Sequence, residues 1–183
     1  IRSFNNGILN VLPRPLTITA NDASREYGEL NPQLTASFDG LASFDDESDI
    51  NGLNISTIAT EYSNASTYGI NISVGSNPNY DINVLPGTLT VTPALVDISI
   101  ADYERLYYEN TDLPTSIVEY AGGLKLDDNF NDLNLELTSN ALLDSDVGEY
   151  VISAVSNNSN YALNVLDFGS LFIRPADLTV NLR

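Results

Sequence analysis

The strongest constraint on this chain is an internal repeat, which limits the folds that it can adopt. Three similar segments, GILNVLP, NYDINVLPGTLTVTP and NYALNVLDFGSLFIRP, end at Pro13, Pro93 and Pro175, which lie 80 and 82 residues apart. After each of these prolines an apolar residue stands at every second position, beginning with Leu16 and Ile18 after the first. Since the period appears both where a repeat ends and where the next one starts, we interpret it as a duplicated domain.

The repeat predicts how the chain is divided. We expect two complete small domains at 14–93 and 94–175, with 1–13 as the closing strand of a preceding module and 176–183 as the opening strand of a following one. Such periods are typical of arrays in which each repeat contacts its neighbours. Because no Gly/Ser-rich linker separates the two domains, we expect them to be arranged end to end.

Within each repeat the pattern is that of β-strands. Apolar and polar residues alternate in short runs rich in Thr, Val, Ile and Tyr, and turn-forming segments such as SNPN, LPG, AGG and NNSN separate these runs. No run has the spacing of an amphipathic helix. The predicted fold class is therefore mostly β, with strands at 34–38, 55–57, 68–74, 89–91, 117–120, 133–137, 150–154 and 171–173.

Two acidic stretches occupy equivalent places, FDDESDIN at 44–51 and LDDNFNDLN at 126–134. Each is interpreted as either one short helix or an acidic loop. Asp and Asn are favourable in the first turn of a helix, where they accept hydrogen bonds from free backbone N–H groups.

Composition excludes several classes of function. The 183-residue chain has 7 Lys+Arg and 25 Asp+Glu, a net charge of −18, so nucleic acids and anionic membranes are poor partners. It has no His and no Cys, which excludes the usual general base, thiol catalysis, zinc clusters and disulfides. No apolar stretch is long enough for membrane insertion.

Catalysis is not expected, because no segment carries a motif for it. Adjacent carboxylates arise by chance in so acidic a chain and do not predict a glycosidase. Lys125 is the single lysine, and neither a Ser–Lys dyad nor an isopeptide bond is expected around it. The prediction is a non-enzymatic protein without a cofactor.

Calcium is the one ion that the sequence leaves open. Oxygen ligands gather at Asp127, Asp128, Asn129 and Asn131, the chemistry that Ca²⁺ prefers. The spacing begins like an EF-hand loop but has Asp132 where that loop needs glycine. These four residues are the calcium candidates, and a solvated acidic loop without metal is the favoured alternative.

The first repeat resembles a known family. LTITANDASREYGELNPQL, STYGINISVGSNPNY and LPGTLTVTP are similar to the MBG-type repeat with a Tyr-Gly signature, found in tandem in bacterial surface adhesins. The second repeat departs from the signature, with Tyr107-Tyr108 in place of Tyr27-Gly28. The resemblance implies β-grasp-like modules, with an Ig-like sandwich as the alternative, an extracellular or cell-surface location and no catalysis.

Tyrosines recur once per repeat at three positions. They are interpreted as side chains that fill the core, with hydroxyls reaching the rim; the pairs are Tyr27/Tyr107, Tyr68/Tyr150 and Tyr80/Tyr161. Phe38 and its counterpart are likewise expected to be buried. Gly28 is expected to have a positive φ or to form a bulge, which predicts that the turn at Tyr108 differs.

The leading functional hypothesis is a structural stalk or spacer in a secreted or cell-surface bacterial adhesin. Its partners would be neighbouring repeats of the same chain or like subunits. Two alternatives stay open: a module that itself binds carbohydrate or protein ligands, and a subunit of an extracellular filament assembled by strand addition.

Overall fold

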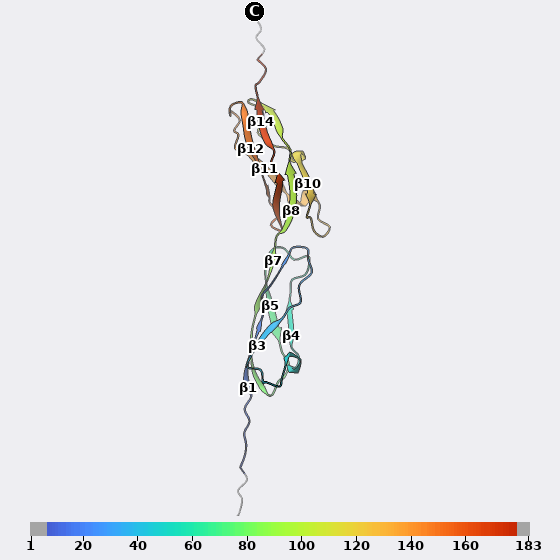
Figure 1. The fold of residues 1–183 in the computed structure, drawn as a ribbon, viewed down its shortest axis with the longest axis vertical. Helices are drawn as coiled ribbons and strands as arrows, with labels where there is room; N and C mark the ends of the chain where they lie inside the picture. The colour runs from blue at the N-terminus through green and yellow to red at the C-terminus, as the bar shows by residue number, and fades with distance from the viewer. Residues whose placement is uncertain (1–6, 179–183) are drawn as a thin grey trace, which may run out of the picture. The chain divides into compact units, whose positions relative to one another are not determined.

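The fold is built from β-strands and short 3₁₀ turns. The computed structural model describes residues 7–178, and within them there is no α-helix (Figure 1). The strands of the first repeat are β1 Arg14–Ala20, β2 Ala23–Glu26, β3 Ala36–Asp39, β4 Asn54–Thr57, β5 Ser66–Ser73, β6 Tyr80–Leu85 and β7 Gly87–Thr92. Those of the second are β8 Ala94–Ile100, β9 Tyr103–Leu106, β10 Val118–Gly122, β11 Leu135–Ser139, β12 Gly148–Ser156, β13 Tyr161–Asp167 and β14 Ser170–Arg174. The mostly-β prediction is confirmed.

The two repeats have the same sheet topology. Each has one three-stranded and one four-stranded sheet, with strand orders β3-β1-β6 and β2-β7-β5-β4 in the first repeat and β10-β8-β13 and β11-β12-β14-β9 in the second. In both, the first strand after the proline pairs antiparallel with one neighbour and parallel with the other. This mixture differs from the immunoglobulin sandwich, in which both sheets are antiparallel.

Alternation along the strands places the core between the sheets. In β1 every second residue is buried, as in Leu16, Ile18 and Ala20, because successive side chains of a strand point to opposite faces. Residues from the other sheet, such as Ile70 and Leu89, are also fully buried. The second repeat builds its core in the same way, from Ile100, Ala141, Ile152, Leu171 and Ile173.

The acidic stretches each form one 3₁₀ turn, η1 Glu47–Asp49 and η3 Phe130–Leu133. Both begin with a capping box. The side chain of Asp46 or Asn129 accepts a hydrogen bond from a backbone N–H of the turn, and the side chain of Asp49 or Asp132 accepts one from the backbone N–H of that cap residue. The short-helix reading is therefore confirmed. A third turn, η2, spans Thr115–Ile117.

At the two ends, the described residues 7–13 and 175–178 form no strand. A strand needs a neighbour for its backbone N–H and C=O groups, and these segments have none among the described residues. The rest of the predicted terminal strands, at 1–6 and 179–183, lies outside the described part of the chain. Within residues 7–178, no helix has the length and apolar character to span a membrane.

Candidate functional site

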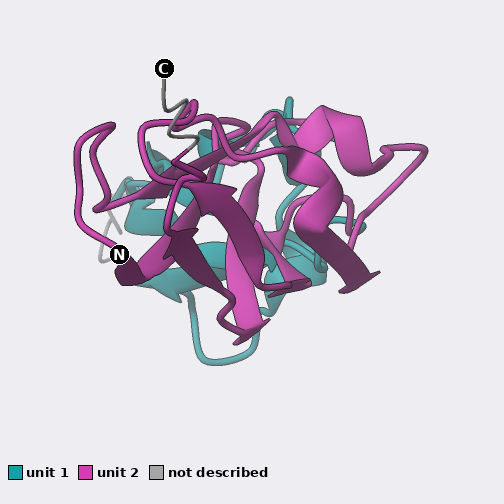
Figure 2. Ribbon diagram, turned by 90° about the horizontal axis from the view of Figure 1, so that it is seen from above, with its two compact units in different colours: residues 1–25, 30–60, 66–91 teal, residues 26–29, 61–65, 92–183 magenta. Residues whose placement is uncertain are grey.

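The compact units of the structure do not coincide with the sequence repeats. The first unit comprises 1–25, 30–60 and 66–91, and the second comprises 26–29, 61–65 and 92–183 (Figure 2). Two short pieces of the first repeat thus belong to the second unit. The candidate site is built around these pieces, within the second unit.

The first piece is a tight turn at 26–29. The N–H of Glu29 donates to the carbonyl of Glu26 at 3.3 Å, and Gly28 has φ +78°. A positive φ at the third residue is the mark of a type II turn, which favours glycine there. The N–H of Tyr27 donates to the carbonyl of Thr92 at 2.8 Å, which holds the turn against the end of β7.

Tyr27, Tyr161 and Asp128 form the core of the site, called here the tyrosine cluster. Both hydroxyls donate to the same carboxylate oxygen, Asp128 Oδ2, from Tyr27 at 3.0 Å and from Tyr161 at 2.6 Å. The two rings meet edge to face with centroids 5.5 Å apart, a favourable arrangement for aromatic pairs. Tyr27 is 6% exposed and Tyr161 4% exposed, so this contact is dry.

The cluster holds both phenols in the neutral form. Burial raises the pKa of Tyr27 above its ordinary value of 10.0, and the hydrogen bond to Asp128 raises it further. Burial, followed by the bond to Asp128, raises the pKa of Tyr161 more strongly. Both causes act in one direction, since a buried phenolate beside a carboxylate is unfavourable.

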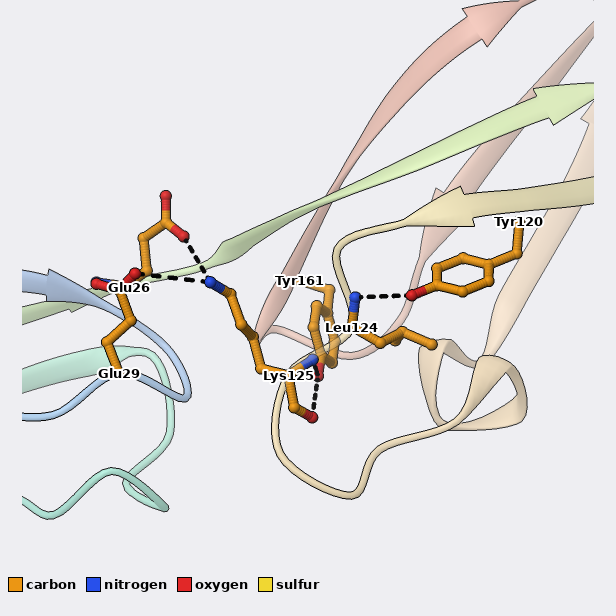
Figure 3. Close-up of polar contacts among 6 residues, drawn as sticks. All are labelled: Glu26, Glu29, Tyr120, Leu124, Lys125 and Tyr161. Carbon is orange, nitrogen blue, oxygen red and sulfur yellow. Dashed lines mark hydrogen bonds and ion pairs between the residues drawn. The ribbon is translucent and has the colours of Figure 1, made fainter.

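Lys125 completes the site from the loop that follows β10. Its Nζ lies 3.4 Å from Glu26 Oε2 and 3.6 Å from Glu29 Oε1, and its backbone N–H donates to the Tyr161 hydroxyl at 3.1 Å (Figure 3). A Cβ added to Gly28 would overlap Lys125 Cβ and lie 3.0 Å from its Cγ. The chain's single lysine therefore forms ion pairs with two carboxylates of the turn, and its Cβ leaves room there for glycine only.

The second piece, 61–65, contacts Asn160, which precedes Tyr161. Asn160 Nδ2 donates to Asn64 Oδ1 at 3.0 Å, and the N–H of Ala65 donates to Asn160 Oδ1 at 2.8 Å. Asn160 is 8% exposed, and both ends of its amide are satisfied, as buried amides require.

The second repeat carries a copy of the turn at 106–109. Glu109 N–H donates to the Leu106 carbonyl at 3.2 Å, and Tyr107 N–H donates to the Arg174 backbone carbonyl at 2.8 Å; these bonds are equivalent to those of the 26–29 turn. Tyr108, in the place of Gly28, has φ +69°. The prediction of a positive φ at Gly28 is confirmed, and the prediction of a different turn at Tyr108 is wrong. The surrounding hydrogen bonds hold the turn even where the residue is unfavourable.

A buried arginine lies two residues before the tyrosine of each turn. Arg25 Nε donates to Asn31 Oδ1 at 2.7 Å, and its Nη2 donates to the Thr60 carbonyl. Arg105 Nη2 donates to the Leu142 carbonyl at 2.6 Å, whereas its buried Nε has no partner among the described residues. Sequence analysis missed this pair, although an arginine two residues before Tyr27 and before Tyr107 is itself a repeated signal.

The structure gives the calcium candidates other roles. Asp128 accepts both tyrosine hydroxyls, Asn129 caps η3, the backbone of Asn131 donates to Asn129 Oδ1 at 3.0 Å, and Asp127 is exposed. Within residues 7–178, no group of three or more acidic side chains is arranged to hold a metal ion. Calcium binding at these four residues stays a prediction.

The tyrosines predicted to fill the core differ in burial. Tyr27 and Tyr161 are buried, and partly buried tyrosines pack against the apolar clusters: Tyr68, Tyr80 and Tyr150. Tyr107, at 39% exposure, and Tyr120, the counterpart of Phe38, are exposed, so the prediction is wrong there. Tyr27 is buried by its contacts with Tyr161 and Asp128, which sequence periodicity does not reveal.

Comparison with protein families decides the identity of the first repeat. Residues 16–90 match the family described as the MBG domain (YGX type). This part of the chain belongs to the MBG family. Two Tyr-Gly pairs, 27–28 and 68–69, lie inside the match, and the first of them forms the turn of the candidate site. No curated protein matches the chain.

MBG domains are typical of bacterial surface proteins. The second repeat has the strand order of the matched MBG domain in both of its sheets. It also keeps the turn, the buried arginine and the acidic 3₁₀ turn. The two halves are therefore similar, as a tandem repeat requires.

Proposed function

We propose that this chain is a non-enzymatic structural spacer in an extracellular or cell-surface bacterial protein. Its role is to extend and display another part of that protein, with successive repeats arranged end to end. The two similar MBG-like halves support this reading, since copies of one small domain are how arrays gain length.

The observation that carries the proposal is the buried tyrosine of the 26–29 turn. Tyr27 belongs to the first repeat by sequence, yet its hydroxyl and ring are buried beside Asp128 and Tyr161 in the second unit. A force applied along the chain would have to break this dry, hydrogen-bonded contact before the turn could leave the unit. A spacer that transmits force along an array needs such continuity from one repeat to the next.

The connection between the repeats also supports a spacer. β7 ends at Thr92 and β8 begins at Ala94, so Pro93 alone stands between the two strands. Proline fixes φ near −65° and removes a rotatable degree of freedom from the backbone. We propose β-grasp-like modules on the same grounds, because each carries a mixed sheet with a parallel strand pair.

Small-angle scattering tests the extended arrangement. A compact globule of 183 residues should have a radius of gyration of about 16 Å. Two modules of about 12 Å each, with centres roughly 40 Å apart, should give about 23 Å. We expect the larger value at low protein concentration, with no change when calcium is added. A value near 16 Å would mean that both repeats share one core, and the spacer proposal would be withdrawn.

A further inference from the structure

The first unit contains a second copy of the arrangement of Tyr161, Asp128 and a backbone N–H that packs against Tyr27 in the second unit. Tyr80 donates to Asp45 Oδ2 at 2.5 Å, as Tyr161 does to Asp128, and the Ala42 N–H donates to the Tyr80 hydroxyl at 3.0 Å. Position 42 is thus the counterpart of Lys125, whose N–H donates to Tyr161. The tyrosine, the carboxylate and the backbone donor are all in place.

The two copies differ in what covers them. Tyr161 has Tyr27 edge-on against its ring, whereas no tyrosine among the described residues packs in this way against Tyr80. Asn79, the counterpart of the buried Asn160, is exposed. A hollow of about 290 Å³ lies at this place, and Asp45, Asn79 and Tyr80 are among the residues that line it.

The charge around the Asp45–Tyr80 arrangement also suits an acidic turn like the one at 26–29. In the second unit Lys125 pairs with Glu26 and Glu29 of the turn. The first unit has Ala42 at that position but places Arg14 close by, with Nε donating to the Gly40 carbonyl at 2.6 Å. The Arg14 side chain of β1 therefore brings a cation to the same loop, at Gly40, two residues before Ala42.

We propose that the Asp45–Asn79–Tyr80 hollow is a docking site for the Tyr-Gly-Glu turn of another repeat of this kind. The incoming tyrosine donates to Asp45 and packs edge-on against Tyr80, its glycine lies over Ala42, and its glutamate faces Arg14. The inference rests on the proposed function in assuming further repeats in the array. The contacts proposed here are those that Tyr27 and its turn make with Asp128, Tyr161 and Lys125 in the second unit.

The test adds one repeat to the intact chain. A copy of residues 14–93 is inserted between Pro13 and Arg14, so that its Tyr27 turn precedes the original first repeat. The chain has no cysteine, and Ala42→Cys in the original repeat therefore gives a single thiol beneath the expected glycine. We expect an uncharged maleimide to label this thiol at least about tenfold more slowly than in the chain without the insert, because docking must open first.

Three controls make the result specific. Tyr27→Ala in the inserted copy should restore fast labelling, whereas Phe44→Ala in that copy should not, because Phe44 is exposed and lies outside the 26–29 and 61–65 pieces. A cysteine at Phe44, which is 98% exposed, should react at the same rate with and without the insert. Labelling at position 42 that is equally fast in both chains overturns the proposal.

A double-mutant cycle gives an independent readout if the cysteine variant does not fold. Tyr27→Phe in the inserted copy is combined with Asp45→Asn in the original one. The expected coupling is about tenfold in the unfolding equilibrium constant, as for Tyr27→Phe with Asp128→Asn in the unmodified chain. No coupling at Asp45, with coupling at Asp128, overturns the docking site.

Scattering on the inserted chain separates this inference from the proposed function. Slow labelling in a compact particle would support the docking site and contradict the spacer. Fast labelling in an extended particle would contradict the docking site and support the spacer.

Discussion

The 26–29 and 106–109 turns have nearly the same backbone but different surroundings. Both close with a bond from the fourth residue to the first, and both have a positive φ at the third residue. Tyr27 is 6% exposed beneath Tyr161 and Lys125, whereas Tyr107 is 39% exposed and Tyr108 is 63% exposed. The turn is thus fixed by the repeat to which it belongs, and the burial of its side chains is fixed by what packs on it.

The difference also explains why one turn has glycine and the other tyrosine. A positive φ alone does not require glycine, since Tyr108 adopts it. At Gly28 a side chain would also collide with Lys125, so conformation and space act together. The Tyr-Gly signature therefore marks a covered turn as well as a left-handed one.

The largest expected effect comes from removing the buried tyrosine. Tyr27→Ala should lower the free energy of unfolding of the second unit by about 3 kcal/mol, because a buried ring and its hydrogen bond are lost. Tyr107→Ala should cost about 1 kcal/mol or less, as for a partly exposed side chain. Urea unfolding of both variants measures the two losses. Equal losses would contradict the comparison.

A smaller loss is expected when the covered glycine gains a side chain. Gly28→Ala should cost about 2 kcal/mol, from the left-handed conformation and the collision with Lys125. Gly69→Ala is the matched control, because an added Cβ there meets only the side chain of Asn71 at 3.9 Å. Thermal unfolding monitored by circular dichroism compares them.

The reciprocal change sharpens this result. Tyr108→Gly relieves the left-handed conformation but adds freedom to the unfolded chain, so its net effect should lie within about 1 kcal/mol of zero. If Gly28→Ala were equally mild, space around the turn would not matter.

The tyrosine cluster should make stability fall at high pH. The pKa values of Tyr27 and Tyr161 are raised in the folded state, so folding favours the protonated phenols. Their contribution is complete below the ordinary tyrosine pKa of 10.0 and is lost as the pH rises from there through the folded values.

Unfolding measurements between pH 9 and pH 12 test this dependence. Above pH 10 the expected slope is at most about 1.4 kcal/mol per pH unit for each of the two tyrosines. Tyr161→Phe should reduce the slope, because it removes one of the two phenols that bond to Asp128. An unaltered slope in Tyr161→Phe would remove the cluster as its cause.

The smallest effect concerns the arginines beside the two turns. Asn31 accepts from Arg25 Nε, and the equivalent position eighty residues later is Thr111. The buried Arg105 Nε has no partner in the part of the chain that the structure describes. Thr111→Asn should supply that acceptor and raise the free energy of unfolding by about 0.5–1 kcal/mol. Thr111→Val is the matched control. A gain in both variants would show that the hydrogen bond is not the cause.

Sequence alone predicted the repeat and the strands with clear alternation, but not the short strands β2 and β9 or the absence of strands at 7–13 and 175–178. Alternation at Leu16 and Ile18 and at the corresponding positions of the second repeat is a local signal, because a strand buries one face whatever lies beyond it. The capped turns at Asp46 and Asn129 were likewise accessible, since a cap involves residues only two or three positions apart. These features depend on neighbours along the chain.

Only the tertiary structure decided the site and the role of its residues. Tyr27 and Asp128 are 101 positions apart, and no periodicity pairs them. Asp128 was a calcium candidate by composition, but its Oδ2 accepts two phenols because the fold brings both to it. Tyr27 and Tyr107 occupy the same place in their repeats and differ in burial. A repeated sequence determines a repeated backbone, and long-range packing determines which copies of a side chain are buried.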